Sequence, residues 1–112
     1  MKDLKAAPSS RDAEESVLGC ILLDGVSIYE KVSAWIRDEE AFYYKDNRIV
    51  WKAIKKIYKE GEAIDMIGVA NIVKDDNPDE KLNYFITGLT SNIVTTANVE
   101  YHAKIIWERH IQ

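Results

Sequence analysis

The sequence predicts an all-α domain, namely a compact orthogonal bundle of about six helices. Three observations point to this class. Apolar residues recur at helical spacing in six segments, capping or turn residues separate these segments, and no segment alternates for long enough to pair into a sheet. The 112 residues, 46% of them hydrophobic and 30% charged, suffice for one globular domain. We assign residues 1–8 to a flexible lead-in and residues 9–112 to this domain.

The first two predicted helices lie between residues 9 and 36. Ser9 or Ser10 can cap the first helix, because a serine hydroxyl accepts hydrogen bonds from the first free backbone N–H groups. Asp24-Gly25 ends it. Gly19 lies inside this helix, where glycine costs about 1 kcal/mol relative to alanine, so we expect a close approach to another helix there. The second helix is predicted from the spacing of Ile28, Val32, Trp35 and Ile36, a stripe that places Trp35 in the core.

The third and fourth predicted helices each follow a polar capping residue. Asp46 or Asn47 can cap the third helix, and Gly61 supplies its left-handed stop. Asp65 can cap the fourth. The third helix has the clearest apolar stripe of the chain, formed by Ile49, Val50, Ala53, Ile54, Ile57 and Tyr58.

The last two predicted helices are separated by an irregular link. Asn77-Pro78 forms a turn, and the proline suits the first position of the fifth helix. Residues 90–96 break the helical pattern. Asn98 can cap a sixth helix that runs on through Tyr101 and Ile105.

The sequence offers no catalytic constellation. It has no phosphate-binding glycine loop and no metal-binding H-E-x-x-H pattern. Glu14 and Glu15 are adjacent and point about 100° apart on a helix, so we interpret them as charges at a helix start. Cys20 is the only cysteine, which excludes an intrachain disulfide and agrees with a cytoplasmic protein. We predict no catalytic, metal or cofactor site in this chain, and no membrane segment.

Two surface features favour binding to other molecules. Lys52, Lys55, Lys56 and Lys59 lie opposite the apolar stripe of the third helix, although the net charge of −4 makes a solvated face the simpler interpretation. Trp51 falls off that stripe, and Trp107 lies near the end of the chain. Because an exposed tryptophan is a favoured interface anchor, both are candidate contact residues.

Several motifs, in order, resemble the amino-terminal domain of DnaB-type replicative DNA helicases. The run at residues 13–19, Ala-Glu-Glu-Ser-Val-Leu-Gly, resembles the opening of that domain, and later parts match in order. The later matches are Phe42-Tyr43, Gly61 with Ile64-Asp65, and Ala97-Asn98 with Tyr101. The resemblance covers roughly residues 8–109 and includes Glu14, Gly19, Asp65 and Asn98. Departures, such as Ala41 in place of an aspartate and Lys81-Leu82-Asn83 in place of paired glycines, indicate a divergent member, such as one from a phage or mobile element.

The resemblance implies a collar domain without catalytic activity. Full-length members form hexameric rings whose separate motor domain uses ATP and Mg²⁺ and handles the DNA. The amino-terminal domain would pair with itself and dock primase or the helicase loader. On this basis we expect Tyr101, Ile105, Trp107 and Trp51 to be contact residues. By the same resemblance, the sixth helix would lead into a helical hairpin that this sequence does not contain. Three alternatives stay open, namely the helicase-binding domain of a primase, a helix-turn-helix DNA-binding module that would use the lysine face, and a small enzyme, for which no converging site is found.

Overall fold

A computed structural model describes residues 10–112, and the predicted lead-in at residues 1–8 lies outside the described part, as does Ser9. It confirms the all-α class, since the described residues form six α-helices and no strand. A single 3-10 turn, η2, covers Glu39–Ala41. The helices are α1 Arg11–Asp24, α2 Val26–Ser33, α3 Lys45–Lys59, α4 Met66–Asp76, α5 Glu80–Gly88 and α6 Val99–His110.

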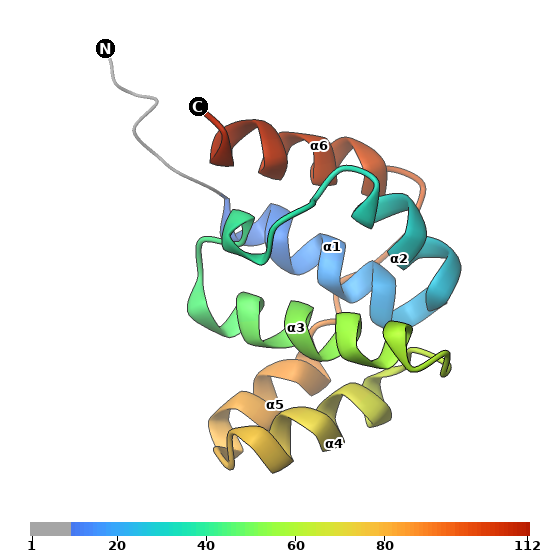
Figure 1. Ribbon diagram of the computed structural model, residues 1–112, viewed down its shortest axis with the longest axis vertical. Coiled ribbons are helices and arrows are strands. Elements are labelled where there is room, and N and C mark those ends of the chain that lie inside the picture. The colour runs from blue at the N-terminus through green and yellow to red at the C-terminus, as the bar shows by residue number, and fades with distance from the viewer. Residues whose placement is uncertain (1–9) are drawn as a thin grey trace.

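The helices stack along the long axis of a body that measures 43 × 28 × 26 Å (Figure 1). At one end α6 packs on α1 and α2, α1 also packs on α3, and the α4–α5 pair packs under α3 at the other end. The irregular link at residues 89–98 therefore carries the chain from one end of the stack back to the other. Helices α1 and α3 supply the centre of the core, with Val17, Leu18, Ile21, Val50 and Ile54 all fully buried.

Four predicted start and stop signals are confirmed. The Ser10 hydroxyl accepts a hydrogen bond from the Ala13 backbone N–H at 3.2 Å and caps α1. Asp65 caps α4 by accepting from the Gly68 N–H at 2.8 Å. Gly25 and Gly61 have φ angles of 80° and 74°, a left-handed backbone that only glycine adopts without strain. The local chemistry of the sequence therefore sets these helix ends.

The predicted placement of Trp35 in the core is wrong. Helix α2 ends at Ser33, so helical spacing no longer fixes the direction of the next side chains. Ile36 still reaches the core, but Trp35 is 36% exposed. Its indole N–H donates to the Glu100 carboxylate of α6 at 3.4 Å. The tryptophan therefore lies at the surface between the end of α2 and α6.

Three predicted helix starts also differ in the structure. Tyr44 is the N-cap residue of α3, so neither Asp46 nor Asn47 caps that helix. Asp79 caps α5 by accepting from the Lys81 N–H at 2.9 Å, and Pro78 lies before the cap. Asn98 does occupy the N-cap position of α6, but its side chain makes no capping hydrogen bond. In each case a neighbouring residue or the backbone takes the predicted role.

The predicted close approach at Gly19 is confirmed, but the neighbour is the chain beyond α5 and not the face of a helix. A Cβ atom built on Gly19 would collide with the carbonyl oxygen of Leu89 and lie 3.0 Å from the Ile93 side chain. Glycine is therefore required where the link leaves α5 and crosses α1.

Candidate protein-docking site

A buried carboxylate fixes α1 against the start of α3. The Glu14 side chain is fully buried at 0% exposure. It accepts hydrogen bonds from the backbone N–H of Tyr43 at 2.8 Å and of Tyr44 at 3.4 Å, and from the Asn47 amide at 2.8 Å. Glu14 does lie in the first turn of α1, as interpreted from the sequence, but its carboxylate is buried, which the sequence did not indicate. These three donors replace the water that the carboxylate loses on burial.

The segment that Glu14 holds is fixed from its other side by two arginines. The Arg48 guanidinium donates to the carbonyl oxygens of Phe42 at 2.9 Å and Tyr43 at 2.8 Å. The Arg11 guanidinium lies 4.0 Å from the centre of the Tyr44 ring, close enough for a cation–π interaction. Residues 42–44 are thus held by both charge and hydrogen bonds, and they set the position of α1 relative to α3.

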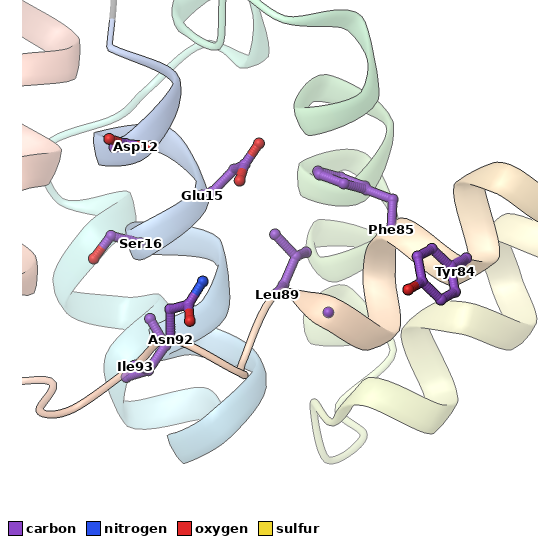
Figure 2. A pocket seen from close by; sticks show the side chains of 9 residues that line it. Asp12, Glu15, Ser16, Tyr84, Phe85, Leu89, Asn92 and Ile93 are labelled. Atoms are coloured by element: carbon purple, nitrogen blue, oxygen red, sulfur yellow. The ribbon is translucent and has the colours of Figure 1, made fainter.

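A groove of about 640 Å³ lies between α1 and α5 (Figure 2). We call it the acidic groove, because Asp12 and Glu15 stand on its α1 side. The opposite wall carries Tyr84 and Phe85 of α5, and the link that crosses α1 adds Ile93. The α1 wall is positioned by Glu14, and the crossing of the link is positioned by Gly19. The two wall helices are joined at one end only, where the link passes over Gly19.

The acidic groove combines apolar surface with negative charge. Tyr84 is 81% exposed, which is unusual for so large a side chain, while Leu89 at the base of the groove is buried. Asp12 is exposed, and Glu15 is half-buried and paired with Arg11 at 3.3 Å. An apolar concave surface with a few charged groups at its edge is the usual form of a recognition site. The predicted contact residues did not include this groove.

Trp51 is removed from the predicted contact residues. It is only 2% exposed, and its ring lies 5.2 Å from the rings of both Tyr29 and Phe42. A buried tryptophan between two aromatic rings stabilises the core and offers no surface to a partner. Trp51 lies off the stripe of α3 and is nevertheless buried, because Tyr29 and Phe42 from outside that helix pack against its ring.

The other three predicted contact residues lie together on α6. That helix buries Val99, Ala103 and Ile106 against the core. Tyr101 is 63% exposed, and Ile105 and Trp107 are half-buried. The indole ring of Trp107 lies 5.3 Å from the imidazole ring of His110. We call Tyr101, Ile105 and Trp107 the α6 surface, and its role as a contact surface stays a prediction.

Over residues 10–112, no three His, Cys, Asp or Glu side chains are placed to hold a metal ion. In the same part of the chain, no helix is both long and apolar enough to cross a membrane. Burial raises the pKa of the Cys20 thiol, which keeps it neutral and poorly nucleophilic at neutral pH.

This architecture is an all-α domain with grooves between its helices, and comparison with known proteins identifies its family. Residues 6–108 match the model of the DnaB-like helicase N terminal domain, so the chain belongs to that family. The amino-terminal domain of DnaB helicase from Mycobacterium tuberculosis has the same fold, with a TM-score of 0.83 and 28% identity over 93% of this chain and 75% of that one. The family match favours a helicase domain over a primase domain or a helix-turn-helix module.

Three relatives of this chain are replicative DNA helicases. The chain is 27% identical to the replicative DNA helicase DnaB of Rhodothermus marinus over 94% of its own length, and 27% identical to the replicative DNA helicase DnaC of Bacillus subtilis over 93%. It is 29% identical to DnaB of Buchnera aphidicola over 91%. The chain spans only 11% to 23% of the length of these relatives.

Proposed function

We propose that this chain is the non-catalytic collar domain of a hexameric replicative DNA helicase, and that it docks primase or the helicase loader. ATP and Mg²⁺ would serve the motor domain of the whole protein, as would contact with DNA. The observation that carries the proposal is the acidic groove, because a docking domain needs a concave apolar surface on a rigid support.

The chemistry of the acidic groove selects the docked segment. Tyr84 and Phe85 can bury an apolar anchor, and such aromatic side chains are favoured at the centres of interfaces. Asp12 and Glu15 attract a lysine or arginine beside that anchor and repel an acidic segment. We therefore expect a helix or extended segment that carries both apolar and basic residues. Docking would widen or narrow the space between α1 and α5 and so alter the geometry of the ring.

The α6 surface serves the second part of the proposed function, which is contact between subunits. Tyr101 is exposed on the side of α6 away from the core, and Trp107 lies half-buried at the edge of the core on the same helix. A second subunit that covers them would remove apolar area from water at roughly 25 cal/mol per Å². The docking groove and the subunit contact then lie on different helices, so that one subunit can make both contacts at once.

Docking is tested by the mass of this chain in solution, alone and with the carboxy-terminal domain of the cognate primase, using light scattering after size exclusion. We expect a complex with the unchanged chain and a loss of about tenfold or more in affinity for Tyr84→Ala, which removes a hot-spot side chain. Tyr43→Ala is the matched control, because Tyr43 is also an exposed tyrosine but does not line the groove. Equal losses in the two variants would contradict docking at this groove.

Subunit contact is tested in the full-length protein. We expect Tyr101→Ala combined with Trp107→Ala to lower the mass of the oligomer at a concentration where the unchanged protein is hexameric. Ile67→Ala is the control, because Ile67 is an exposed apolar residue on α4. If the double variant forms a hexamer of the same mass that resists salt as well as the unchanged protein does, the α6 surface is excluded as a subunit contact.

A further inference from the structure

A second groove, between α3 and α4, has the opposite charge to the acidic groove. Its volume is about 430 Å³, and we call it the lysine groove. Lys45, Lys52 and Lys56 of α3 stand along it, with Asp76 as the one carboxylate among its lining residues. The chain has a net charge of −4, so charges distributed at random would make a groove negative on average. A groove with a positive lining therefore needs an explanation.

The three lysines form a row along one face of α3. They are spaced by seven and four residues, which places their side chains one above another on the helix. The row extends over about 17 Å at 1.5 Å per residue, or roughly three turns. Lys52 is paired with Glu39 at 3.6 Å, whereas no carboxylate of the described residues lies within ion-pairing distance of Lys45 or Lys56. Two of the three charges are therefore available to a ligand.

The bottom of the lysine groove is aliphatic. Ile49 of α3 and Ile72 of α4 are half-buried, and Val73 is 2% exposed beneath them. A ligand that fills this groove therefore has to present apolar side chains to α4 and negative charges to α3. An amphipathic helix with carboxylates along one edge of its apolar stripe has this pattern, and helix-in-groove binding reads such side chains at positions i, i+4 and i+7.

Single-stranded nucleic acid fits this surface less well. Binding of unpaired bases relies on exposed aromatic rings for stacking, and the lining of the groove contains none. The aromatic side chains of α3 are engaged elsewhere, since Trp51 is buried and the Tyr58 hydroxyl donates to the Glu30 carboxylate at 2.8 Å.

We infer that the lysine groove is a second docking site, which binds an acidic amphipathic helix of a partner protein. The inference goes beyond the proposed docking at the acidic groove and does not depend on it. The two sites select opposite charges, so that a basic segment and an acidic segment can bind one subunit without competing.

The probe for this site is a labelled peptide of about 16 residues, with leucine at helical i, i+3, i+4 and i+7 spacing and glutamate beside the leucines. We expect it to bind the chain in fluorescence anisotropy at about 50 mM salt and to weaken as salt rises. A peptide with lysine in place of glutamate tests the charge, and a scrambled peptide of the same composition tests the spacing. Both should bind at least tenfold more weakly.

The location is tested by Lys45→Glu combined with Lys56→Glu, which should weaken binding of the acidic peptide by at least tenfold. Lys31→Glu combined with Lys81→Glu is the matched control, since both lysines are exposed and neither lines the groove, and it should lose less than about twofold. Ile72→Ser tests the apolar contact and should lose about fivefold. Circular dichroism of each variant checks that the fold is kept.

Four outcomes would overturn the inference. The acidic peptide could fail to bind, or the scrambled peptide could bind equally well. A single-stranded DNA of about 20 nucleotides could bind more tightly than the peptide and depend on the same lysines, which would identify a nucleic-acid surface. Finally, the mass of the chain alone could rise with concentration and fall in the lysine variants, which would identify a second copy of this chain as the occupant.

Discussion

The acidic groove and the lysine groove have a similar position between helices but carry charged side chains of opposite sign. Each lies between two helices and has an apolar base. The acidic groove has aromatic side chains, Tyr84 and Phe85, whereas the lysine groove has aliphatic ones, Ile49 and Ile72. One wall of each groove belongs to the central pair, α1 or α3. A small helical domain can therefore offer two docking sites of different specificity without enlarging its core.

The two grooves differ most in what holds their walls together. Helix α4 packs directly on α3 along the lysine groove. The walls of the acidic groove are joined where Leu89 and Ile93 cross α1 at Gly19. We therefore expect the lysine groove to be the more rigid of the two, and the acidic groove to be the one whose shape responds to a ligand or a mutation.

The largest predicted effect comes from Glu14→Ala, which should destabilise the fold and so weaken binding at both grooves. It leaves the N–H groups of Tyr43 and Tyr44 and the Asn47 amide without their acceptor. We expect a loss of about 3 kcal/mol in the free energy of unfolding, since buried bonds to a charged group are strong and costly to leave unmade. Urea denaturation measures this loss.

The neighbouring Glu15→Ala is the control for Glu14→Ala, because Glu15 makes an ion pair with the exposed Arg11. Such a pair contributes little, so we expect a change below about 0.5 kcal/mol. If the two substitutions destabilised the chain equally, the hydrogen bonds of Glu14 would not be what holds α1 against α3.

The next largest effect, from Gly19→Ala, should change binding at one groove and not at the other. The new methyl group would collide with the Leu89 carbonyl and push the link away from α1. We expect a loss of about 1–2 kcal/mol, because the strain of overpacking exceeds the gain in helix propensity. Binding at the acidic groove should fall, whereas binding of an acidic peptide at the lysine groove should stay within about twofold.

Gly88→Ala is the control for Gly19→Ala, because nothing lies within contact distance of a Cβ at Gly88. It should stabilise the chain slightly, by up to about 1 kcal/mol. A Gly19→Ala variant that is as stable as the unchanged chain would mean that the crossing link adjusts at no cost.

A smaller effect is expected from reversing the charge of the acidic groove. Asp12→Lys combined with Glu15→Lys should weaken binding of a basic docking segment by about tenfold and remove most of the salt dependence. Affinity for the acidic peptide should change little, because neither residue lines the lysine groove. Glu40→Lys combined with Glu62→Lys makes the same change in net charge elsewhere on the surface, so a similar loss there would indicate a long-range effect of net charge.

The smallest predicted effect is a pH dependence that comes from Cys20 of α1, which lies against the link and outside both grooves. Burial raises the pKa of Cys20 above its ordinary value of 9.0, so the folded chain holds the thiol proton more tightly than the unfolded chain. Its contribution to stability is therefore complete below that value and is lost as pH rises past it. Cys20→Ala should flatten the decline in the free energy of unfolding above pH 9.0, as measured by urea titration.

Four of the helix ends were predictable because their causes are local. Ser10, Gly25, Gly61 and Asp65 act on backbone groups within a few residues, so the sequence alone contains the information. Asn98 marks the limit of such reasoning, since the α6 start that it was predicted to cap forms without its side chain.

The side chains that organise the candidate site were not predictable, because their partners are distant in sequence. Glu14 and its acceptor role depend on Tyr43 and Asn47, about 30 residues later. The ring of Trp51 packs against those of Tyr29 and Phe42, which come from other parts of the chain. The acidic groove lies between α1 and α5. No spacing within either helix indicates that the two helices face each other.

The path of the last link has a consequence for how the chain acquires its fold. The Cys20 thiol faces the Thr95 carbonyl, 75 residues later, and Trp35 reaches Glu100, 65 residues later. The neighbouring helices α3, α4 and α5 can pair early, whereas such distant contacts form slowly. While the protein is being synthesised, the face of α1 that α6 will cover stays exposed until nearly the whole of this sequence has left the ribosome. Loss of the final turns of α6 would therefore leave the core open, because this helix closes the fold.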